Sequence, residues 1–122
     1  MFCSSSVTCA WRRTSGTGRL MRSTSLSLLA YMDGKVVGRI DSTLICSHFD
    51  GSVKAYLDWI CVIKSYRHKG VAQALMQTLR KELKERKADT LIGLIASNED
   101  AQHFYRSLPD SEIRDEGIWI NL

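Results

Sequence analysis

The segment Tyr56–Met76 constrains the fold of this 122-residue chain more than any other stretch. Its pattern predicts a buried strand, a short basic turn with one glycine (Gly70), and the first turns of an amphipathic helix. Such a connection directs free backbone N–H groups and the positive end of the helix dipole at one point. The segment therefore predicts an anion site for a phosphate-bearing compound, surrounded by Arg67, His68 and Lys69.

The excess positive charge lies outside the predicted domain. Of the 17 basic residues, four (Arg12, Arg13, Arg19 and Arg22) precede residue 26, together with none of the 13 acidic residues. The remainder is therefore neutral, whereas a protein that coats nucleic acid usually carries its excess charge on the folded domain. We expect no nucleic-acid partner. We expect no membrane span either, because no apolar run approaches the ~20 residues that one needs.

Residues 1–24 are predicted to be a disordered or irregular leader, and residues 25–122 to form one domain. The leader is rich in Ser, Thr, Gly and Arg and shows no sustained periodicity. An organellar transit peptide, a vector-derived leader and a start codon upstream of the true domain all fit this composition. No apolar core of a secretion signal follows its charges.

An antiparallel meander of three strands is predicted next, at residues 26–32, 35–46 and 53–62. These stretches are rich in apolar and β-branched residues. Asp33-Gly34 is typical of a two-residue hairpin turn, and residues 48–52 make the second connection.

The apolar period then becomes helical. Residues 71–87 predict a helix with one buried stripe, made of Val71, Ala72, Leu75, Met76, Leu79 and Leu83. Residues 90–96 are apolar throughout, which predicts a central strand covered on both faces and parallel to the third strand.

The C-terminal part predicts a second helix and two short strands. The helix is expected from Glu99 to about Leu108, with Ser97 or Asn98 as its N-cap and Pro109 after its end. Residues 112–122 predict two strands joined by a turn at 115–117.

The four cysteines (Cys3, Cys9, Cys46 and Cys61) show no spacing typical of metal sites or disulfide frameworks. Cys61 lies inside an apolar strand, where a reduced thiol is expected to pack as a small hydrophobic side chain. We therefore expect no metal, and a reducing, cytoplasmic setting.

Two motifs, in this structural context, resemble those of the GNAT acetyltransferase superfamily over residues ~25–122. The first is Arg/Gln-x-x-Gly-x-Gly/Ala in the basic turn, and the second is Asn-x-x-Ala-x-x-Phe/Leu-Tyr in the second strand–helix unit. The matching residues are Arg67, Gly70 and Ala72, then Asn98, Ala101, Phe104 and Tyr105. The resemblance implies an α/β (α+β) fold with a mixed, largely antiparallel central sheet flanked by helices.

The resemblance also implies an N-acetyltransferase that passes the acetyl group of acetyl-CoA to a primary amine by direct attack. The backbone amides of residues 68–72 would bind the cofactor's pyrophosphate, and backbone of the third strand would pair with its pantetheine arm. The implied cofactor contacts are Ile60, Cys61, Val62, Arg67, His68, Lys69, Gly70, Val71, Ala72, Asn98, Ala101 and Phe104.

Tyr105 and Asp58 are the expected catalytic residues. By resemblance, Tyr105 stands near the cofactor sulfur and protonates the leaving thiolate; a tyrosine packed in the core is the alternative. Asp58 would take a proton from the amine, directly or through water, or it serves only as an acceptor-side contact or a structural partner. Asn98 is either a cofactor contact or only a helix cap.

The chain departs from the family pattern before the meander. Family members place a strand and two helices there, which wall the acceptor pocket, whereas this chain has about 24 irregular residues. A wall rebuilt by a second copy would make a homodimer. The alternative function is a truncated, non-catalytic acyl-CoA-binding or regulatory module of the same fold, and unrelated phosphate-ligand or nucleic-acid binding is the third hypothesis. The sequence leaves the acceptor open.

Overall fold

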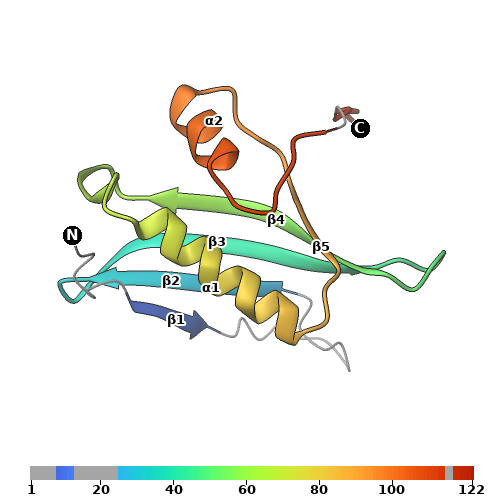
Figure 1. Ribbon diagram of the computed structural model, residues 1–122, viewed down its shortest axis with the longest axis horizontal. Helices are drawn as coiled ribbons and strands as arrows, with labels where there is room; N and C mark the ends of the chain where they lie inside the picture. Colours follow the sequence, from blue (N-terminus) through green and yellow to red (C-terminus); the bar gives the residue numbers. More distant parts are fainter. Residues whose placement is uncertain (1–7, 13–24, 115–116) are drawn as a thin grey trace. The chain divides into compact units, whose positions relative to one another are not determined.

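The computed structural model describes residues 8–12, 25–114 and 117–122. They form two compact units, Met1–Ile92 and Gly93–Leu122. The first unit contains a sheet with the strand order β1-β2-β3-β4-β5 and the helix α1, and the second contains the helix α2 (Figure 1). The α/β class and the mixed sheet agree with the fold expected from the sequence.

The predicted meander is confirmed. The strands β2 (Ser25–Met32), β3 (Lys35–Cys46) and β4 (Val53–Val62) pair antiparallel in that order. The turn between β2 and β3 has positive φ at both central residues, 53° at Asp33 and 73° at Gly34. Asp-Gly tolerates this left-handed conformation, which matches the twist of a tight hairpin.

The strand β1 (Thr8–Arg12) corrects the expectation that residues 1–24 are irregular throughout. It pairs antiparallel with β2, with Trp11 opposite Leu28. The edge of β2 offers backbone hydrogen-bonding groups to any extended neighbour, and this pairing outweighs the Ser- and Arg-rich surroundings that suggested disorder. The rest of the expected leader lies outside the described residues.

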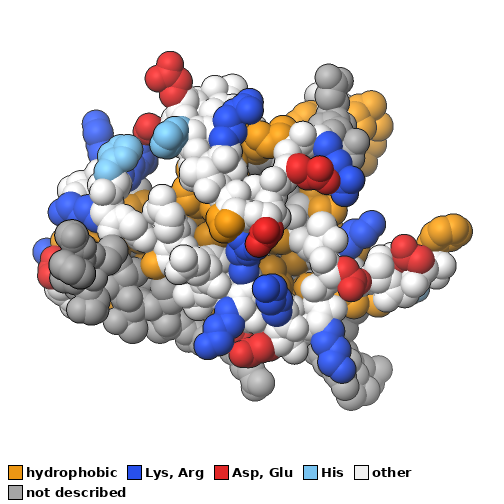
Figure 2. All heavy atoms as spheres, viewed as in Figure 1, with side chains coloured by type: hydrophobic (Ala, Val, Ile, Leu, Met, Phe, Trp, Pro, Cys, Tyr) orange, Lys and Arg blue, Asp and Glu red, His pale blue; other side chains and the backbone are white. Residues whose placement is uncertain are grey.

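The helix α1 (Val71–Glu85) packs on one face of the sheet, and its predicted apolar stripe is confirmed apart from Ala72, which is half-buried (Figure 1). Charged side chains of both signs are interspersed along its outer face (Figure 2). Beneath it lies the core, formed by Leu26, Leu28, Ala30, Val37, Ile40, Ala55, Leu57, Val71, Leu75, Met76, Leu79 and Leu83.

Gly38 lets α1 approach β3 closely. A Cβ atom at this position would lie 2.9 Å from Val71 Cγ1 and 3.1 Å from Leu75 Cδ1. The absence of a side chain on β3 therefore sets how near the first turns of α1 come to the sheet.

The strand β5 (Thr90–Gly93) is parallel to β4, as predicted, but it is not a covered central strand. Asp89 forms two hydrogen bonds with Val53, from its N–H to the Val53 carbonyl (2.7 Å) and from the Val53 N–H to its Oδ2 (2.9 Å). The two strands therefore begin side by side. β5 lies last in the strand order, and Thr90 and Ile92 are exposed while Leu91 is half-buried. An apolar run shows that its residues favour a strand, but it does not show which neighbouring elements cover that strand.

In the second unit, α2 (Glu99–Arg106) confirms the predicted helix, which ends before Pro109. The two strands predicted in residues 112–122 are not formed in the described residues 112–114 and 117–122, and residues 115–116 lie outside the description. Trp119 is 72% exposed. A β-favouring sequence becomes a strand only where a partner accepts its backbone hydrogen bonds.

No helix in the described part of the chain is long and apolar enough to cross a membrane.

Candidate functional site

A β-bulge interrupts β4 at Asp58. Ser42 of β3 lies opposite Leu57, and the next pair joins Asp41 to Trp59, so Asp58 has no cross-strand partner. The extra residue places Asp58 and Trp59 next to each other on the exposed face of β4, while Leu57 stays buried. This bulge was not predicted from the sequence.

A signal for the bulge was present in the sequence. The inward-facing positions of β4 shift from odd to even numbers, from Ala55 and Leu57 to Ile60 and Val62. A regular strand keeps a period of two, so such a shift marks one inserted residue.

The outer edge of β4, on the side away from β3, carries the backbone groups of Ile60 and Val62. Ile63 N–H donates to the Val37 carbonyl at 2.8 Å. Because hydrogen-bonded and non-hydrogen-bonded pairs alternate in an antiparallel ladder, Ile60 and Val62 direct their N–H and C=O groups away from β3. β5, with four residues against the ten of β4, is too short to accompany this second half. An extended ligand could therefore pair with the edge.

Cys61 corrects a prediction. Its thiol is exposed and free, whereas its apolar neighbours in the sequence predicted that it packs as a small hydrophobic side chain. Cys61 lies opposite Arg39, on the face of the sheet that α1 does not cover. An apolar neighbourhood in sequence does not decide which face of a strand is buried.

The basic turn presents unbonded backbone amides. A short 3-10 helix (Lys64–Tyr66) precedes it, and His68 (φ 60°) and Gly70 (φ 81°) both take the left-handed conformation. The first helical hydrogen bond runs from Ala74 N–H to the Gly70 carbonyl at 3.0 Å. No hydrogen bond among the described residues uses the amides of residues 68–72. These amides lie at the N-terminus of a 15-residue helix that has no acidic residue in its first turn, an arrangement that favours an anion.

The basic side chains around this turn are exposed, and two of them have local partners. Arg67 Nε donates to the Val62 carbonyl at 3.2 Å, which joins the turn to the outer edge of β4. Lys69 Nζ lies 5.2 Å from the ring centroid of Tyr66, a cation–π contact. Among the described residues, no group of His, Cys, Asp or Glu side chains could hold a metal ion.

In the second unit, α2 organises the other motif. Asn98 is the N-cap, and its Oδ1 accepts a hydrogen bond from Ala101 N–H at 2.8 Å. The rings of Phe104 and Tyr105 are half-buried and meet edge to face, with centroids 5.2 Å apart. Burial raises the pKa of the Tyr105 phenol above its ordinary value, so the hydroxyl keeps its proton over a wider pH range.

The predicted site residues thus form one group in each unit. The first unit brings together the bulge at Asp58, the edge at Ile60 and Val62, and the turn at residues 67–72. The second gathers Asn98, Ala101, Phe104 and Tyr105 on one short helix.

Comparison with solved structures places the fold. An aminoglycoside acetyltransferase from an uncultured soil metagenomic sample, determined with sisomicin, has a TM-score of 0.75 and 18% identity, over 84% of this chain and 69% of its own. A ribosomal-protein-alanine N-acetyltransferase from Brucella melitensis has a TM-score of 0.70 and 24% identity, over 83% of this chain and 71% of its own. An integron cassette protein from V. cholerae has a TM-score of 0.71 and 25% identity, over 81% of this chain and 62% of its own.

Sequence comparison assigns the family. No curated protein matches the chain. The sequence profile of the acetyltransferase (GNAT) family matches residues 4–108, and so begins well before residue 25, where the domain was expected to start. The chain belongs to the GNAT acetyltransferase family.

Proposed function

We propose that the protein transfers the acetyl group of acetyl-CoA to a primary amine. The observation that carries this proposal is the set of unbonded amides of residues 68–72 at the start of α1, tied by Arg67 to the open edge of β4. The amides would bind the pyrophosphate of the donor. The backbone of Ile60 and Val62 would pair with the amides of its pantetheine arm, as an added strand does.

The reaction we propose is direct attack of the amine nitrogen on the thioester carbonyl. A C–N bond forms and the C–S bond breaks through a tetrahedral intermediate, so the amine loses a proton and the thiolate gains one. Asp58 would accept the amine proton, directly or through water. Tyr105 would protonate the thiolate, and burial, which raises the pKa of its phenol, keeps the hydroxyl protonated until then.

We base the proposed class of acceptor on the proposed reaction, which needs an amine, and on the names of proteins with a similar structure. Two of the similar structures are an aminoglycoside acetyltransferase and a ribosomal-protein-alanine N-acetyltransferase, and both names point to amino-group acceptors. Because one name refers to a small molecule and the other to a protein, the proposed acceptor can be an amine of either kind.

Donor binding is tested by Gly70→Glu. The longer, negative side chain should block the amides and repel the pyrophosphate, so that CoA no longer raises the melting temperature. Gly51→Glu is the matched control, because Gly51 also has a positive φ (71°) but lies in the β3–β4 turn. CoA stabilisation that survives Gly70→Glu would place the donor elsewhere.

Turnover is tested by measuring thiol release from acetyl-CoA with a panel of amines. Tyr105→Phe should depress kcat and leave CoA affinity nearly intact, because only the proton donor is lost. Full turnover by this variant would refute the role of Tyr105. CoA binding without release on any amine would favour the non-catalytic module, in which Asp58 serves only as the structural partner of Thr43.

A further inference from the structure

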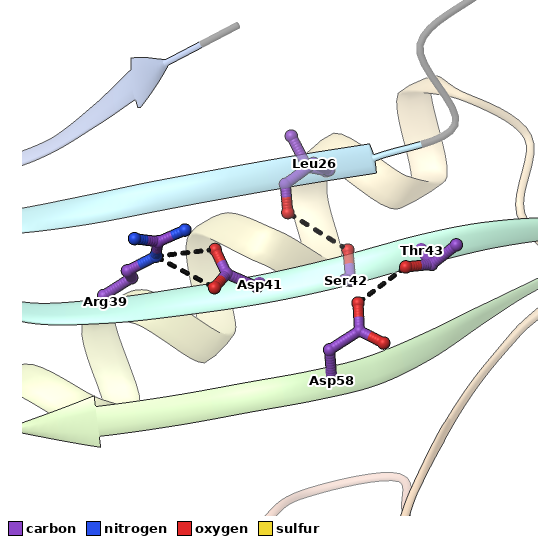
Figure 3. Close-up of polar contacts among 6 residues, drawn as sticks. All are labelled: Leu26, Arg39, Asp41, Ser42, Thr43 and Asp58. Atoms are coloured by element: carbon purple, nitrogen blue, oxygen red, sulfur yellow. Dashed lines mark hydrogen bonds and ion pairs between the residues drawn. The ribbon is translucent and has the colours of Figure 1, made fainter. Parts of the chain in front are cut away.

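Thr43 holds the carboxylate of Asp58 across two strands. Thr43 Oγ1, on β3, donates a hydrogen bond of 2.6 Å to Asp58 Oδ2, on β4, and Figure 3 shows the two side chains pointing toward each other. In the strand register Thr43 lies opposite Tyr56, so the contact reaches diagonally to the residue that the bulge leaves unpaired. A side chain on such an exposed bulge would otherwise sample several rotamers.

The contact leaves the carboxylate available. It uses Oδ2 alone, and no hydrogen bond among the described residues uses Oδ1. The nearby cation on β3, Arg39, donates from Nε to both oxygens of Asp41 at 2.9 Å (Figure 3). Asp58 is thus oriented by a neutral hydroxyl and not by a counter-charge, which fits a group that must accept a proton.

We propose that Thr43 is a positioning residue for amine deprotonation, acting through Asp58. This inference rests on the proposed function, in which Asp58 takes the proton of the amine. A hydroxyl that fixes one carboxylate oxygen would present the other to the acceptor at a constant angle, and general-base catalysis depends on that geometry.

The test is a double-mutant cycle in steady-state kinetics with the best amine of the panel. Thr43→Val keeps the β-branched shape and removes the donor, and it should lower kcat about ten-fold, while Asp58→Asn should lower it about a hundred-fold. The double variant should be no slower than Asp58→Asn, since Thr43 acts only through that carboxylate. Thr43→Ser, which restores a hydroxyl, should recover kcat to within about three-fold, and the KM for acetyl-CoA should not change in any variant.

Thr78→Val is the matched control. It makes the same chemical change on α1, where Thr78 Oγ1 donates to the Ala74 carbonyl at 2.8 Å, and it should leave kcat unaltered. If Thr43→Val prevents folding, Thr43→Ala removes the same hydroxyl and replaces it in the cycle.

With an active enzyme, three results would overturn the inference. An unchanged kcat in Thr43→Val, or a fall that Thr43→Ser does not rescue, would reduce the contact to a structural one. A further fall in the double variant would show that Thr43 acts independently of Asp58. Absence of turnover by the unmodified protein on every amine would instead refute the proposed function, and the role of Thr43 with it.

Discussion

Arg67 Nε and the Val62 carbonyl oxygen lie 3.2 Å apart, and this hydrogen bond links two features that the sequence presents separately. One is the turn that offers backbone amides at the start of α1, and the other is the outer edge of β4. Because the bond uses only one of the guanidinium N–H groups, the others remain able to face an anion. The pyrophosphate and pantetheine parts of a CoA molecule would thus meet a single connected backbone.

Arg67→Lys should weaken CoA binding although the charge is kept. A lysine side chain has no Nε N–H and no planar fork, only a single ammonium group at Nζ. It therefore cannot keep the bond to Val62 and face an anion as arginine does. We expect a three- to ten-fold rise in Kd, the size of about 1 kcal/mol for one net hydrogen bond, measured by calorimetry. Lys64→Gln is the control, because it removes a charge beside the turn without touching β4, and an equal effect of both variants would assign the binding to charge alone.

Gly38→Ala should destabilise the protein and also weaken CoA binding. The new methyl would crowd Val71 Cγ1 and Leu75 Cδ1, at 2.9 and 3.1 Å, and displace the first turn of α1 that carries the amides. Overpacking of this kind costs about 1–3 kcal/mol, measurable by urea unfolding. Gly34→Ala, in a turn where nothing lies within 4 Å of a Cβ, should leave CoA affinity unchanged. If Gly38→Ala binds CoA with unaltered affinity, the position of the first turn of α1 does not determine CoA binding.

Asn98→Ala should loosen α2, because Ala101 N–H loses its acceptor. The expected cost is about 0.5–2 kcal/mol, seen as faster amide exchange at Ala101. Ser97→Ala should have no such effect, since the structure assigns the cap to Asn98.

Asn98→Asp extends the same experiment, because aspartate caps a helix as well as asparagine but adds a negative charge. Weaker CoA binding in this variant would make Asn98 a cofactor contact in addition to a cap. Unchanged binding would limit it to the cap.

Tyr105 should ionise only above the ordinary range of a tyrosine, because burial raises the pKa of its phenol above 10.0. The folded pKa exceeds the unfolded one, so this group leaves stability intact below pH 10 and lowers it as pH rises through the folded pKa. An ultraviolet titration of tyrosinate, wild type minus Tyr105→Phe, should show a midpoint above pH 10. A midpoint at or below that value would contradict the burial argument.

The sequence predicted the parts of the fold in which local pattern and final burial agree. The bounds of β2, β3, β4 and α1 follow from apolar periodicity and turn residues, and Asn98 was one of two candidate caps. It did not predict β1, the exposure of Cys61 or the edge position of β5. Each of these depends on which strand becomes a neighbour and which face a helix covers, and neither is encoded in a window of residues.

The backbone amides of the candidate site could be predicted from the sequence, but the surroundings of the Asp58 carboxylate could not. The glycine-bearing turn before a helix is a local pattern, so residues 68–72 could be chosen without coordinates. The bond between Thr43 and Asp58 joins two strands through a bulge, and only the register reveals it.

The unpaired place of Asp58 has one more consequence. Removing this residue altogether would align Leu57 with Ser42 and Trp59 with Asp41 as consecutive rungs, so every other pairing of β3 with β4 could persist. The sheet is complete without it. A variant lacking residue 58 should therefore melt no earlier than the parent and still fail to turn over any amine, whereas early melting would show that the insertion serves the architecture.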